Sequence, residues 1–436
     1  MKANSWIWIL PLIVGLHAQA QQAKEIKVND VPVVYRYVPN GLVSAYVVFY
    51  GGVANYDSTE AGIEYTAIHT AYESGIPGLP GDQMQDLFAE LGIMVGPIAQ
   101  RHYAGFSITA PAEYIDTAIS IIGKLLTNAI FDEKSYQKVI QRQKAIINNE
   151  WSNPDDALRI WSITHMFKGY DYEKYHKGTN SSLANLTYQK VKDYYTNRLV
   201  DKSRAFVVVV GDVKENRIQN WSLFKILPAR NMKVKFNLPD RIQFDTSELF
   251  TLHREGMATN YIRGIVGAPK LNTSDEVPYR LAFEILDDKM FVEIRTKRNL
   301  SYAPAAFYTT VMKTPYAILY VSSTLPDSAA SVMWRTVKNV IENGFSEKEF
   351  RNTKELMRTR FYLQLEGNAS MAGAYVRHEM IAGDWQRADK YSDWIKQTTL
   401  EQVNGALRKY ARGIRWYYLG DTTQIKNKQV YHRILQ

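Results

Sequence analysis

The chain has 436 residues, 46% of them hydrophobic, and a formal net charge of +9. This length exceeds what one hydrophobic core usually organises, and it predicts two globular domains. The sequence contains no cysteine, which excludes disulfides, thiol chemistry and a lipid anchor on cysteine. Its mild basic excess comes without any nucleic-acid-binding motif.

The first 20 residues have the pattern of a secretory signal. Lys2 supplies a positive charge, and the apolar run over residues 6–16 is shorter than the roughly 20 residues that a membrane-spanning helix needs. Ala18-Gln19-Ala20 then forms a small-x-small cleavage site. We expect residues 1–20 to be removed, and the mature protein to be soluble in the periplasm with no stable membrane anchor.

Strands and helices alternate in the first half of the remaining chain. Asn40-Gly41 is a hairpin signal between two β-branched runs. Ser58 and Thr59 are typical helix caps, and Gly75 is a typical helix end. In chain order, the predicted elements are strands over 33–38 and 42–50, helices over 60–73 and 83–91, strands over 93–98 and 103–110, and helices over 114–128 and 133–150.

The second half repeats landmarks of the first half in the same order. Phe131-Asp132-Glu133 opens a charged helix, and Phe345-Ser346-Glu347 opens another one 214 residues later (345 minus 131). Each half closes on a strand that ends in Gly-Asp, at residues 211–212 and 420–421. This repetition indicates a duplicated unit. We predict an α+β fold of two homologous domains, each a mixed β-sheet with helices packed on one face, over residues 21–229 and 244–436 with a linker at 230–243.

The helix predicted over 60–73 carries Tyr65-Thr66-Ala67-Ile68-His69 after Ala61-Gly62. This segment resembles the zinc helix of the pitrilysin/insulinase family of metallopeptidases, whose inverted motif is His-x-x-Glu-His. The resemblance implies that Tyr65 replaces the first zinc ligand and that Ile68 replaces the general base. A phenol is a poor zinc ligand near neutral pH, and isoleucine has no proton acceptor.

The third zinc ligand of that family, by the same resemblance, falls on Glu150, and the acid seven residues before it is replaced by Gln143. We therefore expect no metal and no catalytic residue in this chain, with His69 and Glu150 as vestigial positions. The plainer alternative is that His69 is a packed helix histidine and Glu150 a solvated helix end. His378-Glu379 gives no second metal motif, because Ala382 stands where a second His would be needed.

The second half contains a segment, residues 290–302, that resembles the C-terminal signature of the same family, Leu-Arg-x-Lys-x-x-Leu-x-Tyr. Its Arg and Tyr fall on Arg295 and Tyr302. The resemblance implies that this pair holds the substrate carbonyl near a zinc ion, and an arginine and a phenol are suitable donors for a developing oxyanion. The alternative is structural: a salt bridge for Arg295 and sheet packing for Tyr302.

The resemblance extends over nearly the whole mature chain and is to the two-domain, processing-peptidase branch. There, one subunit often carries zinc and a similar subunit carries the Arg–Tyr pair. We therefore expect a non-catalytic, substrate-positioning subunit of a heterodimeric periplasmic zinc metallopeptidase that degrades or processes peptides, with the zinc in a homologous partner. Two alternatives stay open: a free-standing peptide-binding or scaffolding protein, and a peptidase with an unorthodox metal site on His69 and Glu150. Gly96-Pro97, where the family usually has Asn-Ala, weakens the case for peptide binding by strand addition.

Overall fold

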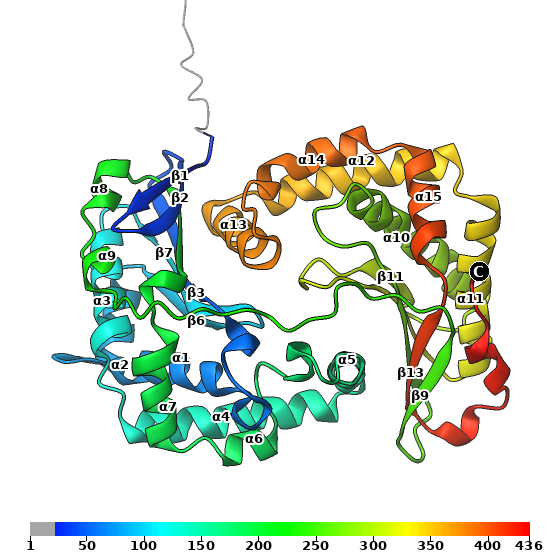
Figure 1. Cartoon of the computed structure of the whole chain (residues 1–436), viewed down its shortest axis with the longest axis horizontal. Coiled ribbons are helices and arrows are strands. Elements are labelled where there is room, and N and C mark those ends of the chain that lie inside the picture. Colours follow the sequence, from blue (N-terminus) through cyan, green and yellow to red (C-terminus); the bar gives the residue numbers. More distant parts are fainter. Residues whose placement is uncertain (1–21) are drawn as a thin grey trace, which may run out of the picture.

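A computed structural model describes residues 22–436, so the predicted signal at residues 1–20 lies outside the described part. The molecule has two lobes side by side, each built on one large β-sheet (Figure 1). No helix within residues 22–436 is long and apolar enough to cross a membrane.

The first lobe contains a six-stranded sheet in the order β1-β2-β8-β3-β7-β6, in which β2 and β8 are parallel and the other pairs antiparallel. Strand β8, of sequence AFVVVVG, is buried along its whole length, as expected for a strand covered on both faces. The strands are β1 (Lys24–Val28), β2 (Val31–Tyr37), β3 (Leu42–Tyr50), β6 (Met94–Ala99), β7 (Tyr103–Pro111) and β8 (Ala205–Gly211), with a separate small hairpin of β4 (Gly75–Ile76) and β5 (Leu79–Pro80). The helices are α1 (Ile63–Ser74), α2 (Gly81–Glu90), α3 (Ile115–Asn128), α4 (Glu133–Ser152), α5 (Pro154–Met166), α6 (Asn180–Ala184), α7 (Tyr188–Tyr194), α8 (Glu215–Gln219) and α9 (Leu223–Ile226).

The second lobe contains a five-stranded sheet in the order β11-β12-β10-β13-β9, in which β13 and β9 are parallel. Its strands are β9 (Glu248–His253), β10 (Asn260–Val266), β11 (Ala305–Tyr308), β12 (Ala317–Ser323) and β13 (Ile414–Gly420). Its helices are α10 (Glu276–Met290), the short π-helix η6 (Phe291–Thr296), α11 (Pro326–Asn343), α12 (Glu347–Gln364), α13 (Asn368–Ala382), α14 (Arg387–Gln397) and α15 (Leu400–Tyr410).

Five strands of each sheet share the same topology, and β1 extends the first sheet by one more strand. The order β2-β8-β3-β7-β6 matches the order β9-β13-β10-β12-β11, including the one parallel pair in each sheet. The repeated landmarks fall on matching elements, since Asp132 caps α4 and Ser346 caps α12. The predicted fold class, two homologous α+β domains, is therefore confirmed, while the exact domain and linker boundaries stay predictions.

The start of the helix predicted over 60–73 is wrong by three residues. Gly62 adopts a left-handed backbone (φ 94°), so the α-helix begins only at Ile63. Ser58 and Thr59 belong to a separate 3₁₀ turn, and Asp57 caps that turn by accepting from the Thr59 amide. The predicted end is confirmed, because Gly75 follows the last helical residue with a φ of 74° that favours glycine.

Each lobe sends one helix onto the sheet of the other lobe. Helix α13 lies against β3 and β8 of the first sheet, and α5 lies against β10 and β13 of the second (Figure 1). These helices begin 214 residues apart (368 minus 154), so they are equivalent elements of the repeat. Each sheet thus has its own helices on one face and a helix of the other lobe on the opposite face. Two separate hydrophobic clusters contain residues of both lobes and join them.

Candidate functional site

Helices α1 and α4 pack together at the place where the sequence predicts a degenerate metal site. Gln143 of α4 crosslinks them. Its side-chain oxygen accepts from the Thr66 hydroxyl at 2.7 Å, and its amide nitrogen donates to the carbonyls of Gly62 at 3.1 Å and Lys177 at 2.7 Å. An ionised glutamate has no proton to donate to those two carbonyls. Gln143 therefore makes two hydrogen bonds, to the carbonyls of Gly62 and Lys177, that an ionised glutamate at this position could not make.

His69 is enclosed by an aromatic ring and a cation. The Tyr65 ring stacks on it with centroids 4.0 Å apart, and Nη2 of Arg142 lies 3.5 Å from its Nδ1. Burial and, secondly, the Arg142 charge lower the pKa of His69 to about 4. Arg142 is in turn fixed by Glu73, at 2.8 Å. His69 is thus a neutral, packed histidine near neutral pH.

Within the described residues, no hydrogen bond or ion pair joins Glu150 to His69. It accepts from the Tyr175 hydroxyl at 2.7 Å and pairs with the Lys177 ammonium at 2.6 Å. Burial raises the pKa of the Tyr65 phenol, which disfavours the phenolate that a metal ligand requires.

These residues do not fit a zinc ion. A guanidinium lies against one of the candidate ligands and an ammonium holds the other, so a divalent cation would be repelled by both. Within residues 22–436, no group of three or more His, Asp or Glu side chains is arranged to hold a metal ion. The arrangement instead stabilises the α1–α4 contact by stacking and ion pairs.

Replacing Arg142 by methionine should raise the pKa of His69. The guanidinium is the second cause of its low pKa, and burial, the largest cause, should still keep the value below the ordinary 6.5. An NMR titration of the imidazole measures this directly. Lys138→Met is the matched control, because Lys138 pairs with the same Glu73 at 2.6 Å but is not among the groups that shift the pKa of His69. An unchanged pKa in the Arg142 variant would contradict the geometry described above.

Glu64 is a buried acid of α1 that the sequence analysis does not single out. One oxygen accepts from Asn55 at 2.6 Å and from the Tyr194 hydroxyl at 2.8 Å. Desolvation outweighs these bonds and raises the pKa of Glu64 to about 7. The partners lie 9 and 130 residues away in sequence, so no local signal identifies this environment.

The raised pKa of Glu64 makes stability depend on pH. Its folded value of about 7 lies above the ordinary 4.5, so the native state binds this proton more tightly than the unfolded state. Its contribution is therefore fully present below pH 4.5 and is lost as the pH rises through about 7. Between pH 5 and pH 8, the free energy of unfolding of Glu64→Gln should rise by roughly 2–3 kcal/mol relative to that of the wild type. Urea unfolding at both pH values measures this, and parallel pH profiles would contradict it.

Arg295 and Tyr302 are brought together by the second lobe. The guanidinium carbon of Arg295 lies 4.2 Å from the centroid of the Tyr302 ring and 4.9 Å from that of Phe291. Arg295 lies on the π-helix η6, directly after α10. Such π-turns are rare and occur often at functional sites. The structure therefore joins the two residues that the sequence singles out.

Neither structural alternative for this pair is observed. Within residues 22–436, the Arg295 side chain makes no ion pair or hydrogen bond, because the one acid of η6, Glu293, is already paired with Lys297 and Arg298 at 2.6 Å each. Tyr302 is 78% exposed and lies outside the strands of the sheet. Both donors are thus available to a group outside this lobe.

Pro97 lies on β6, which is one of the two edge strands of the first sheet. Proline is tolerated at such an edge because its missing N–H need not face a neighbouring strand. The same missing donor reduces what this edge could offer to an added peptide strand.

Three kinds of comparison place this chain among known proteins. A family model described as "Peptidase M16 inactive domain" matches residues 185–357. The uncharacterized zinc protease YmxG of Bacillus subtilis (strain 168) is 20% identical over 398 residues, which is 87% of this chain and 93% of that protein.

Solved structures share the fold. The peptidase M16 inactive domain from Pseudomonas fluorescens superposes with a TM-score of 0.82 at 14% identity, over 92% of this chain and 98% of that one. The periplasmic protease PqqL from Escherichia coli superposes with a TM-score of 0.76 at 13% identity, over 97% of this chain but 49% of that one. The fold described here thus accounts for about half of the PqqL chain.

Proposed function

Since this chain is a pitrilysin-like, non-catalytic member of the M16 peptidase family, we propose that it is the substrate-positioning subunit of a heterodimeric zinc metallopeptidase. The partner is a homologous subunit with an intact zinc motif, and the complex degrades or processes peptides in the periplasm. This chain supplies Arg295 and Tyr302 to the partner's site.

The observation that carries this proposal is that Arg295 stacks on the exposed ring of Tyr302 and forms no ion pair within the described residues. Stacking on an exposed ring is worth about 0.5–1 kcal/mol and orients the guanidinium without neutralising its charge. Because no acid of the described residues pairs with Arg295, its N–H groups remain free to donate to a substrate carbonyl. A positioned donor of this kind stabilises the oxyanion of peptide hydrolysis.

The first lobe supports the proposal of a partner. Arg142 contacts His69, and Lys177 forms an ion pair with Glu150. In this proposal, the partner subunit therefore supplies the zinc ion and the general base. The match to about half of PqqL supports a pairing of two such units, because that longer chain has room for a second one. The description of PqqL as periplasmic and the signal-like residues 1–20 support the proposed compartment.

Co-purification from the native host tests the pairing. A tag on the C-terminus of this chain should retrieve, in equal amount, a homologous protein with an intact His-x-x-Glu-His motif. Size-exclusion chromatography with light scattering should then give the mass of one copy of each. Recovery of this chain alone, under conditions where the homologue is expressed, would leave a free-standing peptide-binding protein as the better account.

A further inference from the structure

A small cavity lies in the second lobe where helices α10, α13 and α14 meet the loop between β11 and β12. Three arginines line it, one from each helix: Arg280, Arg377 and Arg387. Its volume is about 20 Å³, somewhat more than the roughly 10–15 Å³ that one water molecule needs. The cavity therefore has room for one water molecule or one monatomic ion, and not for a phosphate or a larger ligand.

The carboxylate in the lining is already occupied by donors. Glu276 is the one acid of this lining among the described residues. One of its oxygens accepts from Arg387 at 2.5 Å, and the other accepts from the Asn272 amide at 2.8 Å. Glu276 thus compensates the charge of Arg387 and leaves the charges of the other two arginines uncompensated.

Those two arginines have weak acidic partners or none. The carboxylate of Glu284 lies 3.9 Å from Arg280 and is shared with Arg360, which lies 3.5 Å from it. Arg377 is exposed and forms no ion pair or hydrogen bond in the described part of the chain. The lining therefore carries a surplus of positive charge.

The positive charges converge on His378, which also lines the cavity. Burial lowers the pKa of His378 to about 3, and the charges of Arg387, Arg377 and Arg280 are the next causes. All three guanidiniums thus lie close enough to this imidazole to disfavour its protonated form. His378 is neutral near neutral pH and can offer one N–H to the cavity.

Two buried polar atoms of the lining have no hydrogen-bond partner within residues 22–436. They are Nε of Arg387 and the hydroxyl oxygen of Tyr391, and these side chains are only 3% and 2% exposed. Both atoms carry a hydrogen that can be donated, and a buried donor without an acceptor is costly. The missing group is therefore an acceptor, and the surplus of positive charge favours an anion over a neutral water molecule.

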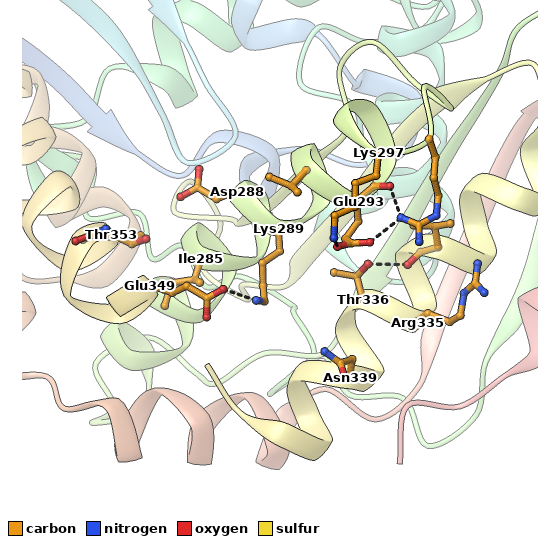
Figure 2. Close-up of a pocket in the computed structure, with 14 residues that line it drawn as sticks. Ile285, Asp288, Lys289, Glu293, Lys297, Arg335, Thr336, Asn339, Glu349 and Thr353 are labelled. Atoms are coloured by element: carbon orange, nitrogen blue, oxygen red, sulfur yellow. Dashed lines mark hydrogen bonds and ion pairs between the residues drawn. The ribbon is translucent and has the colours of Figure 1, made fainter. Parts of the chain in front are cut away.

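A larger cavity of the same lobe shows the contrast. It has a volume of about 610 Å³ and lies between α10, α11, α12 and η6 (Figure 2). Most of its charges neutralise one another, since Lys289 pairs with Glu349, and both Lys297 and Arg298 pair with Glu293. An anion in that cavity would have to compete with internal carboxylates.

We propose that the small cavity binds one chloride ion. Nε of Arg387 and the Tyr391 hydroxyl donate to the ion, and the guanidiniums of Arg280 and Arg377 balance its charge. Helix α13 packs on the sheet of the first lobe, so the ion fixes this helix to α10 and α14 of its own lobe. The site lies wholly within this chain, and it does not depend on the proposed catalytic partner.

Crystals of the full chain soaked in sodium bromide test the site directly, because bromide replaces chloride and is located by its anomalous scattering. One bromide should lie within hydrogen-bond distance of Arg387 Nε and the Tyr391 hydroxyl. A water molecule at this position, in crystals that hold bromide elsewhere on the protein, would overturn the proposal.

Thermal unfolding tests the site in solution. At equal ionic strength, sodium chloride should raise the Tm by roughly 1–3 °C relative to sodium gluconate, since a ligand that binds only the folded state stabilises it. Arg377→Gln and Tyr391→Phe should each remove most of this difference. Both changes are mild, because Arg377 is exposed and the Phe ring still stacks with Arg280, whose guanidinium carbon lies 5.1 Å from the ring centroid.

Arg335→Gln is the matched control. Arg335 is an exposed arginine of α11 that lines the larger cavity and forms no ion pair within residues 22–436 (Figure 2). This variant should keep the full difference in Tm between chloride and gluconate. The same Tm in both salts for the wild type would overturn the proposal. An equal chloride effect in the wild type and in Arg377→Gln and Tyr391→Phe would also overturn it, in favour of unspecific binding to a basic surface.

Discussion

Replacing Arg295 by alanine in the assembled heterodimer should lower kcat/KM for peptide cleavage by about 10²–10³-fold, the usual effect of removing one oxyanion donor. Folding and assembly should be unaffected, because Arg295 has no ionic partner among the described residues of its own chain. Tyr302→Phe should cost less, since the ring that orients Arg295 at 4.2 Å remains. Steady-state kinetics on purified complex measure both effects.

Arg298→Ala is the matched control for these two variants. Arg298 follows the same π-helix and is exposed, but its guanidinium is held by Glu293 at 2.6 Å. Its loss should change kcat/KM by a few-fold at most. A structural role for Arg295 predicts the reverse pattern, with less complex formed and normal activity per complex. Normal kcat/KM in both Arg295→Ala and Tyr302→Phe would leave this chain as a scaffold.

The second large effect is expected where the lobes exchange helices. Tyr375 of α13 is fully buried against the first lobe's sheet, in a core that includes Val48 and Val208. Tyr375→Ala should lower the free energy of unfolding by about 3–5 kcal/mol, as for other buried aromatic truncations. Helix α13 belongs to the second lobe, but the space that Tyr375→Ala leaves lies against the sheet of the first lobe. Both lobes should therefore be destabilised together, in a single unfolding transition.

Two control variants separate burial from other effects at Tyr375. Tyr375→Phe removes only the hydroxyl, which donates to Asp389 at 2.9 Å and accepts from Arg36 at 3.1 Å, and should cost about 1 kcal/mol. Leu363→Ala removes an exposed side chain of α12 (58% exposed) and should cost less than about 0.5 kcal/mol. Two separate urea transitions, with only one shifted by Tyr375→Ala, would show that the lobes are not joined as described.

The duplication could be predicted because its landmarks are local. A charged helix after Phe131 and another after Phe345 became α4 and α12, and the Gly-Asp pairs ended β8 and β13. The packing of α5 and α13 on the sheet of the other lobe could not be predicted. An apolar helix face indicates that the face is buried, but it does not indicate which sheet it packs against. The start of α1 was misplaced because the left-handed backbone of Gly62 depends on neighbours that are distant in sequence.

The sequence predicts contacts between candidate site residues only where those residues are close along the chain. Spacing by four put Tyr65 and His69 on one helix face, where they stack. Arg142 reaches His69 from 73 residues away, and this tertiary contact has no signature in the helix itself. The resemblance of residues 290–302 to a family signature singled out Arg295 and Tyr302, but their stacking depends on a π-turn that the signature does not encode.

Reconstitution from separately purified subunits tests the central claim most directly. This chain and its zinc-bearing homologue should each cleave an unstructured peptide slowly or not at all, and their equimolar mixture should cleave it rapidly. Metal analysis should find one zinc per heterodimer, and this chain alone should hold none. One tightly bound zinc on the isolated chain, with cleavage that a chelator abolishes, would contradict the account and would make His69 and Glu150 part of a working metal site.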